Sequence, residues 1–197
     1  MALTLVKEDG SGKADANSYA SVAECDAYHD GHLYADRWTA ATQARKEAAL
    51  VMATRLIDSQ FQFNGFRAHN QQALQWPRER CPDPDEGVLS SVVMGWANDN
   101  FVEPDVVPAA VVQAACEMAR ELLIADRTAA PAGVGIDTIS TAHSTKDADG
   151  NTSESSSTKY SKGNLPPIIS AVAQAMLSKF GALIYGGGSG AVRLIRA

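Results

Sequence analysis

The sequence predicts a mainly α-helical fold: a small four-helix bundle with a β-hairpin inserted between the third and fourth helices and an extended C-terminal tail. Three observations lead to this prediction. Four stretches repeat apolar residues three and four positions apart, as one face of a helix does. A Thr- and Ser-rich stretch with a central Asp-Gly-Asn sequence separates the third of these from the fourth. A glycine-rich run precedes the last seven residues.

The first two helices have clear beginnings. Ser21 and Glu24 form a capping box, in which each side chain can bond to the other's backbone N–H. We expect this helix to end near residues 31–33, at Gly31. The second helix is predicted over 43–59, with Thr39 or Thr42 as its cap. A less regular, proline-punctuated region follows, from residue 61 to residue 108.

Proline marks the start of the other two helices, because its fixed φ suits the first turn and its missing N–H costs nothing there. Pro108 begins a helix expected to run to about residues 125–128, before Pro131. Pro166 and Pro167 begin the last helix, and Gly181 occupies the position of a C-capping glycine. Because these four helices supply most of the apolar surface, a small bundle is the simplest architecture.

The stretch between the third and fourth helices is predicted to be a hairpin covering about residues 134–162. Asp-Gly and Gly-Asn are typical hairpin-turn sequences. Its arms contain few large apolar residues, namely Ile136, Ile139 and Tyr160. Since a lone hairpin this polar is marginally stable, we expect it to pair with other chains. The alternative is a mobile flap.

The C-terminal stretch combines a flexible composition with an apolar and basic one. Residues 186–197 are therefore predicted to be a hinge and a docking tail, separate from a helical domain over residues 1–185. The apolar side chains would contact a partner surface and the arginines would meet acidic groups there. A frayed terminus is the alternative. The hinge glycines are Gly186, Gly187, Gly188 and Gly190, and the docking residues are Val192, Arg193, Leu194, Ile195 and Arg196.

Composition narrows the possible functions. The chain has 197 residues, 45% of them hydrophobic, and a net charge of −6. No apolar run reaches the ~18 residues that span a bilayer, and the N-terminus lacks the features of a signal peptide. We therefore expect synthesis in the cytoplasm and no membrane partner. The acidic balance argues against a long nucleic-acid-binding face, which needs clustered Lys and Arg.

Candidate metal and redox residues give weak signals. The three cysteines are far apart and form no Cys-x-x-Cys pair, and Cys25 and Cys116 are interpreted as small core residues. His29 and His32, with Asp26 and Asp36 nearby, have ligand-like spacing. No Glu lies between the histidines as it does in a metalloprotease helix, so a solvated helix end is the preferred interpretation.

Catalysis is not indicated either. No Gly-x-Ser-x-Gly sequence supports a catalytic triad. The glycine run lacks the Lys-Ser or Lys-Thr ending of a phosphate-binding loop. We therefore predict no enzyme activity, no cofactor and no metal.

A nucleic-acid clamp is the more serious alternative. Tryptophans and nearby arginines could stack on the bases and neutralise the phosphates of a single strand. The same residues more often form a structural cluster in which Arg packs over aromatic rings, and several carboxylates close by would repel phosphate. The residues concerned are Trp38, Trp76, Trp96, Arg37, Arg67, Arg78 and Arg80.

An ordered set of short motifs resembles a family of tailed-phage and prophage proteins. It covers most of residues 1–130 and is weaker after Pro131. The motifs are Glu8-Asp9-Gly10, Ala16-Asn17-Ser18-Tyr19, Ser21–Tyr28, Trp38, Ala41-Thr42, Lys46–Leu50, Ala53–Asp58, Gln72, Leu74, Trp76-Pro77-Arg78, Val107-Pro108, Val111, Ala114, Glu117 and Ala119.

The resemblance implies one of two functions. The family is often labelled DnaT-like single-stranded-DNA-binding protein, which implies a replication-linked DNA binder. It is also similar to head-tail adaptor, or head-completion, proteins of phages. That similarity implies a virion protein that forms a ring, usually a dodecamer, between the portal protein and the tail or tail-terminator protein, with DNA passing through its channel without specific binding. We expect the second function, because an acidic channel lets DNA slide. In such a ring, residues 192–196 would dock on the portal protein and the hairpin would contact neighbouring subunits or the tail.

Overall fold

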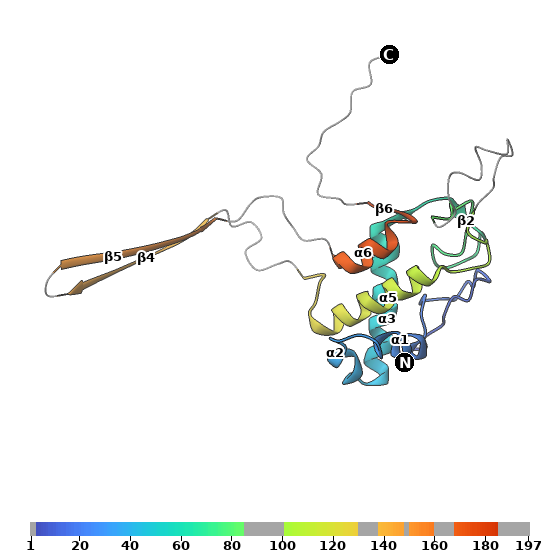
Figure 1. Ribbon diagram of the computed structural model, residues 1–197, viewed down its shortest axis with the longest axis horizontal. Helices are drawn as coiled ribbons and strands as arrows, with labels where there is room; N and C mark the ends of the chain where they lie inside the picture. Colours follow the sequence, from blue (N-terminus) through green and yellow to red (C-terminus); the bar gives the residue numbers. More distant parts are fainter. Residues whose placement is uncertain (1–2, 85–100, 130–137, 148–149, 160–167, 185–197) are drawn as a thin grey trace, which may run out of the picture. The chain divides into compact units, whose positions relative to one another are not determined.

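The computed structural model describes residues 3–84, 101–129, 138–147, 150–159 and 168–184 (Figure 1). The chain divides into two compact units. We call the first unit the body; its described residues are 3–84, 101–127 and 168–184. The second unit contains the hairpin. The two units are described separately below.

Five helices are found in the described part of the body. The two longest, α3 and α5, lie across one another, and α5 also packs against α6 (Figure 1). The helices are α1 (Val22–His29), α2 (Asp36–Thr39), α3 (Gln43–Gln60), α5 (Ala109–Ile124) and α6 (Ala171–Leu177).

The predictions for the two long helices are confirmed. α3 covers the predicted 43–59 stretch, and α5 begins directly after Pro108. Thr42 is the residue before α3, but its side chain makes no capping bond. α5 is buried over seven successive residues, from Ala114 to Arg120, because α1, α2, α3 and α6 all contact it. It is therefore the central helix of the body.

The prediction of a four-helix bundle is wrong. α1 and α6 have only eight and seven residues, α2 is an additional short helix, and the body also contains two small antiparallel sheets. In one sheet β1 (Phe61–Phe63) pairs with β6 (Gly181–Leu183), and in the other β2 (Phe66–Arg67) pairs with β3 (Arg78–Glu79). The region that looked irregular in the sequence supplies three of these strands, because prolines and glycines restrict it to short extended pieces.

The last helix differs from its prediction at both ends. It begins after Ser170, whose hydroxyl accepts a hydrogen bond from the backbone N–H of Ala173. It ends at Leu177, so Gly181 is not its C-cap; Gly181 begins β6 instead. A Cβ at position 181 would lie 2.3 Å from the carbonyl oxygen of Gln62. Glycine is needed there because the two strands approach closely.

Trp76 is the centre of the body's aromatic packing. Its ring is fully buried and meets Phe63 and Phe180 edge-on, with ring centroids 5.7 Å apart in both cases. The Trp76–Pro77 peptide bond is cis. Arg78, which follows, is 4% exposed and donates to the carbonyl oxygens of Asn64 and Gly65, at 2.6 and 2.7 Å. This arginine therefore stabilises the turn between β1 and β2.

A buried polar network ties the same segment to α3. The Tyr19 hydroxyl donates to the carboxylate of Asp58 on α3 and accepts from the backbone N–H of Gln75, at 3.1 Å. Gln75 also donates to the second Asp58 oxygen, at 3.0 Å. Burial raises the pKa of Asp58 to about 6, against the opposing effect of the hydrogen bonds from Tyr19 and Gln75.

A disulfide joins α1 to α5. Cys25 and Cys116 are 91 residues apart in the sequence, and their Cα atoms are 5.3 Å apart in the structure. The prediction that both lie in the core is confirmed, but their covalent link was not predicted. Cys81 is a free, buried cysteine.

The predicted hairpin is found between α5 and α6. β4 (Thr138–Asp147) and β5 (Gly150–Lys159) pair antiparallel over ten positions, from Thr138–Lys159 to Asp147–Gly150. Among the described residues, neither strand pairs with any other strand. Each strand therefore keeps one edge without a ladder partner in the described part of the chain.

Candidate functional site

The N-terminal loop is held around a buried carboxylate. Glu8 is fully buried. Its two oxygens accept backbone N–H groups from Gly10 and Gly12, both at 2.9 Å, and from Lys13, at 2.8 Å. Three charge-assisted bonds to one carboxylate fix the shape of the loop.

The loop packs against the segment that leads into α5. Gly10 has a φ of +101°, and a Cβ at this position would lie 1.7 Å from the carbonyl oxygen of Asp105. Only glycine fits such a contact. The Glu8-Asp9-Gly10 motif of the sequence therefore positions one wall of a surface groove, with α1 and the start of α5 as the other walls.

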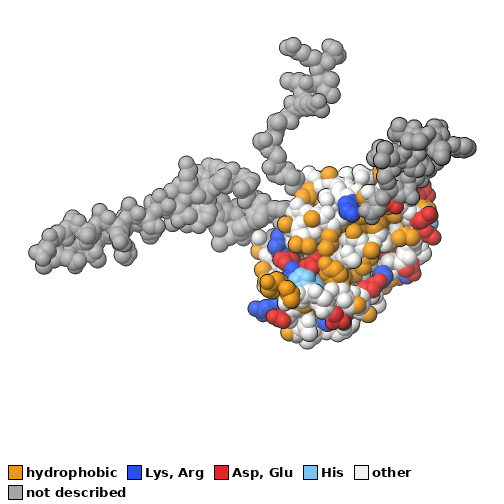
Figure 2. Space-filling model, viewed as in Figure 1, with side chains coloured by type: hydrophobic (Ala, Val, Ile, Leu, Met, Phe, Trp, Pro, Cys, Tyr) orange, Lys and Arg blue, Asp and Glu red, His pale blue; other side chains and the backbone are white. Residues whose placement is uncertain are grey.

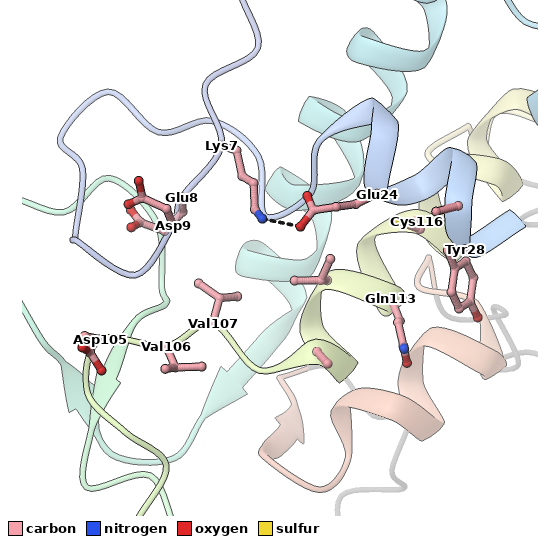
Figure 3. Close-up of a pocket in the computed structure, with 13 residues that line it drawn as sticks. Lys7, Glu8, Asp9, Glu24, Tyr28, Asp105, Val106, Val107, Gln113 and Cys116 are labelled. Carbon is pink, nitrogen blue, oxygen red and sulfur yellow. Dashed lines mark hydrogen bonds and ion pairs between the residues drawn. The ribbon is translucent and has the colours of Figure 1, made fainter.

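The groove has a volume of about 660 Å³ and is open to solvent (Figure 3). Its apolar lining comes mainly from the start of α5, from the segment before it and from α1. Val106 is 43% exposed, and Val107 and Val112 are half-buried. The full lining is Lys7, Glu8, Asp9, Glu24, Ala27, Tyr28, Asp105, Val106, Val107, Ala109, Val112, Gln113 and Cys116.

Carboxylates predominate among the charged groups of the groove. Four carboxylates and one lysine line it. Lys7 pairs with Glu24 on the α1 side, whereas Asp105 lies at the opposite rim (Figure 3). Partial burial alone would raise the pKa of Glu24, but hydrogen bonds from Lys7 and Ser21 lower it. The hydrogen bond from Lys13 likewise lowers the pKa of Asp9, so both groups are ionised near neutral pH.

The capping box at the start of α1 is confirmed and belongs to this rim. The Ser21 hydroxyl accepts from the Glu24 N–H at 3.2 Å, and the Glu24 carboxylate accepts from the Ser21 N–H at 2.8 Å. The same carboxylate bonds to Lys7. Glu24 therefore caps the helix and also forms an ion pair with Lys7 at this rim of the groove.

A second polar cluster lies beside the groove, around a buried glutamate of α5. Glu117 accepts hydrogen bonds from Tyr28 at 3.1 Å and from Arg120 at 3.1 and 3.2 Å, and the His32 Nε2 atom lies 3.3 Å from it. Burial and the nearby Glu117 charge raise the pKa of Tyr28 to about 12. Arg120 also bonds to Glu121, at 2.8 Å. The bond between Tyr28 and Glu117 joins α1 to α5.

The structure brings His29 and His32 together, with ring centroids 5.8 Å apart in an edge-on contact, but the metal-site candidates have different polar partners. The His29 Nε2 atom lies 3.3 Å from the Cys116 carbonyl oxygen, whereas His32 faces Glu117. Asp26 accepts from the Trp38 indole N–H, at 2.8 Å, and from Lys46, at 2.7 Å. No metal-binding group of three side chains is found among the described residues. The preferred interpretation, a solvated helix end, is wrong for His29, which is 3% exposed.

The tryptophans of the proposed nucleic-acid clamp are structural in the described part of the chain. Trp38 and Trp76 are 1% and 0% exposed, so neither ring can stack on a base. Arg78 is occupied by backbone carbonyl groups, and Arg67 donates to the Gln72 carbonyl oxygen at 3.1 Å. Arg37 and Arg80 are exposed on different elements. Trp96 lies outside the described residues.

Most of the predicted assembly residues also lie outside the described residues: the hinge at Gly186, Gly187, Gly188 and Gly190, the docking residues 192–196, Ile136 and Tyr160. Ile139 is found in β4, paired with Thr158.

Sequence reasoning missed the groove, although the Glu8-Asp9-Gly10 motif was a signal for it. On the face of the body in Figure 2, apolar side chains are exposed among acidic and basic ones. No described helix is long and apolar enough to cross a membrane.

A family model described as "Putative DnaT-like ssDNA binding protein" matches residues 3–196. No match is found among curated proteins or among solved structures. Because the family model covers nearly the whole chain, including the groove and the hairpin, the chain belongs to this family.

Proposed function

We propose, from the premise of this family membership, that the chain is a structural subunit of a phage particle. It forms a ring that joins the portal protein to the tail and continues the DNA channel. Residues 192–196 dock on another chain of this assembly. The observation that carries the proposal is the β4–β5 hairpin.

The hairpin supports a role in assembly because two polar strands are not expected to be stable on their own. It is a ladder of ten residue pairs in a unit separate from the body. In the sequence of its two strands, Ile139 is the single large apolar residue. A two-stranded ribbon is marginally stable in water without further strands or a packed face. Pairing along its edges with other chains would supply both missing contributions.

Two features support the same function: the burial of the motif residues in the body and the net charge of the chain. Glu8, Tyr19, Trp76 and Arg78 are buried in contacts that hold the fold. These four motif residues therefore serve the fold. The net charge of −6 suits the wall of a DNA channel, since like charges do not hold phosphate.

The test compares the full chain with a variant in which residues 138–159 are replaced by a short Gly-Ser linker. Native mass spectrometry gives the number of chains in each assembly, and circular dichroism checks that the body keeps its helices. We expect a closed oligomer of the full chain and loss of that oligomer in the variant. An unchanged oligomer without the hairpin, or a full chain that stays monomeric with and without the portal protein, contradicts the proposal.

Single-stranded DNA binding is the second candidate, because the family description names it. One described residue favours it: Phe66 on β2 is 68% exposed. An exposed aromatic ring can stack on a base. This candidate requires tight binding of a fluorescent oligonucleotide that weakens steeply with salt. It also requires Phe66→Ala to weaken binding while Tyr34→Ala, at another exposed aromatic (74% exposed), does not.

A further inference from the structure

We propose that the groove between the N-terminal loop, α1 and α5 of one copy receives residues 191–197 of a second copy. This inference rests on the proposed function, because it requires copies of the chain to assemble. It assigns an occupant to the groove and an acceptor to the docking residues.

The groove offers an apolar surface with acidic margins. Val106 and Val107 contribute apolar side chains between the N-terminal loop and α5 (Figure 3). Val112 of α5 also lines the groove. Asp105 is exposed at one rim, and Glu24 lies at the other. A suitable occupant therefore has medium-sized apolar side chains together with positive charges.

Residues 191–197 have this composition. Their sequence is Ala-Val-Arg-Leu-Ile-Arg-Ala, with three large aliphatic side chains, two arginines and no carboxylate side chain. The aliphatic groups can cover the valines of the groove, and the arginines can reach the carboxylates at its margins in charge-assisted bonds. The chain as a whole has a net charge of −6, whereas this segment is basic, so its charge is complementary to the carboxylates of the groove.

The walls of the groove are fixed before anything binds. The Glu8 carboxylate holds the N-terminal loop through three backbone bonds. The Cys25–Cys116 disulfide joins α1 to α5, and Cys116 itself lines the groove. A preformed site loses little conformational entropy on binding. In a closed ring each copy gives one segment and receives one, so a modest contact is repeated around the ring.

The experiment measures binding of a fluorescein-labelled peptide of residues 188–197 by anisotropy. The receptor is the full chain carrying Leu194→Asp and Ile195→Asp, so that its own segment does not compete. The groove variant adds Val106→Lys. The matched control adds Val172→Lys, because Val172 is 50% exposed on α6 and outside the groove. We expect the groove variant to bind the peptide at least about tenfold more weakly and the control to bind it unchanged.

A charge reversal makes the test specific. A peptide with Arg193→Glu and Arg196→Glu should bind the receptor at least about tenfold more weakly. Adding Asp105→Arg to the receptor should restore part of that loss. Equal peptide binding by the Val106→Lys and control receptors overturns the inference, as does peptide binding to the portal protein but not to the groove.

Native mass spectrometry of the Val106→Lys variant, with its own segment otherwise unchanged, separates this inference from the proposed function. A normal ring with no peptide binding to the groove overturns the inference alone. Specific peptide binding to the groove by a chain that never forms a closed oligomer supports the groove as an acceptor and contradicts the ring.

Discussion

The body and the hairpin satisfy their backbone groups in different ways. In the body, side chains serve the backbone of irregular segments: Glu8 accepts three N–H groups, and Arg78 donates to carbonyl oxygens of the β1–β2 turn. The hairpin uses a ladder of ten residue pairs with one large apolar residue in its strands. The difference teaches that the body carries its own stability, whereas the proposed function requires the hairpin to gain stability from contacts with other chains.

The largest effect should follow from removing the central aromatic ring of the body. Trp76→Ala leaves a cavity between Phe63 and Phe180 and should lower the free energy of unfolding by about 3–5 kcal/mol. Urea denaturation followed by circular dichroism at 222 nm measures it. A loss below about 1 kcal/mol would mean that this ring does not organise the body.

Removal of the disulfide should have the second-largest effect on the stability of the body. Replacing both Cys25 and Cys116 by Ala should destabilise the body by about 2–4 kcal/mol, because the bond restricts the unfolded chain across 91 residues. Reducing agent should bring the unmodified chain to nearly the same urea midpoint. If mass spectrometry of the purified chain finds three free thiols and reductant has no effect, the bond does not contribute.

Asp58 should make the body less stable as the pH rises. Its pKa is about 6 in the folded body and ordinarily 3.8, so between these values the folded state holds a proton that the unfolded state has released. The free energy of unfolding should therefore fall by about 2 kcal/mol from pH 4.5 to pH 7 on account of this group. Arg67 and Arg78 oppose the shift by favouring the carboxylate.

Asp58→Asn is the control for that prediction. The amide cannot titrate, so the difference between the two chains' stabilities should change with pH in the stated direction. Urea midpoints at pH 4.5, 5.5 and 7 provide the measurement. A parallel pH dependence in both chains would assign the effect to another group.

The smallest effect on the body should come from the hairpin. Ile139→Ala should change the body's unfolding free energy by less than about 0.5 kcal/mol, because the hairpin belongs to a separate unit. It should instead shift the equilibrium between oligomer and monomer toward the monomer, as measured by light scattering across a dilution series. A loss of body stability as large as that of Trp76→Ala would contradict the comparison.

Sequence reasoning succeeded where the pattern was local. The α3 and α5 helices, the Ser21 capping box and the pairing of β4 with β5 each follow from patterns within one short stretch of sequence. It failed where distant segments decide the outcome. Gly181 looks like a helix cap, but it faces Gln62 from 119 positions away, and the pairing of Cys25 with Cys116 depends on how α1 packs on α5.

For the same reason, only part of the candidate site could be predicted from the sequence. The Glu8-Asp9-Gly10 motif marked the N-terminal loop, yet the groove exists because Gly10 lies against Asp105 in the folded chain. For the arginines and tryptophans, the sequence left a nucleic-acid clamp open but favoured a structural cluster. Burial of Trp38 and Trp76 agrees with the structural interpretation.

The most direct test of the central claim is cryo-electron microscopy of the purified full-length protein mixed with its portal protein. The account predicts a closed, symmetric ring of this chain bound to the portal, with density for the hairpin between neighbouring subunits. Single copies scattered on the portal, or no symmetric oligomer with or without it, would contradict the account.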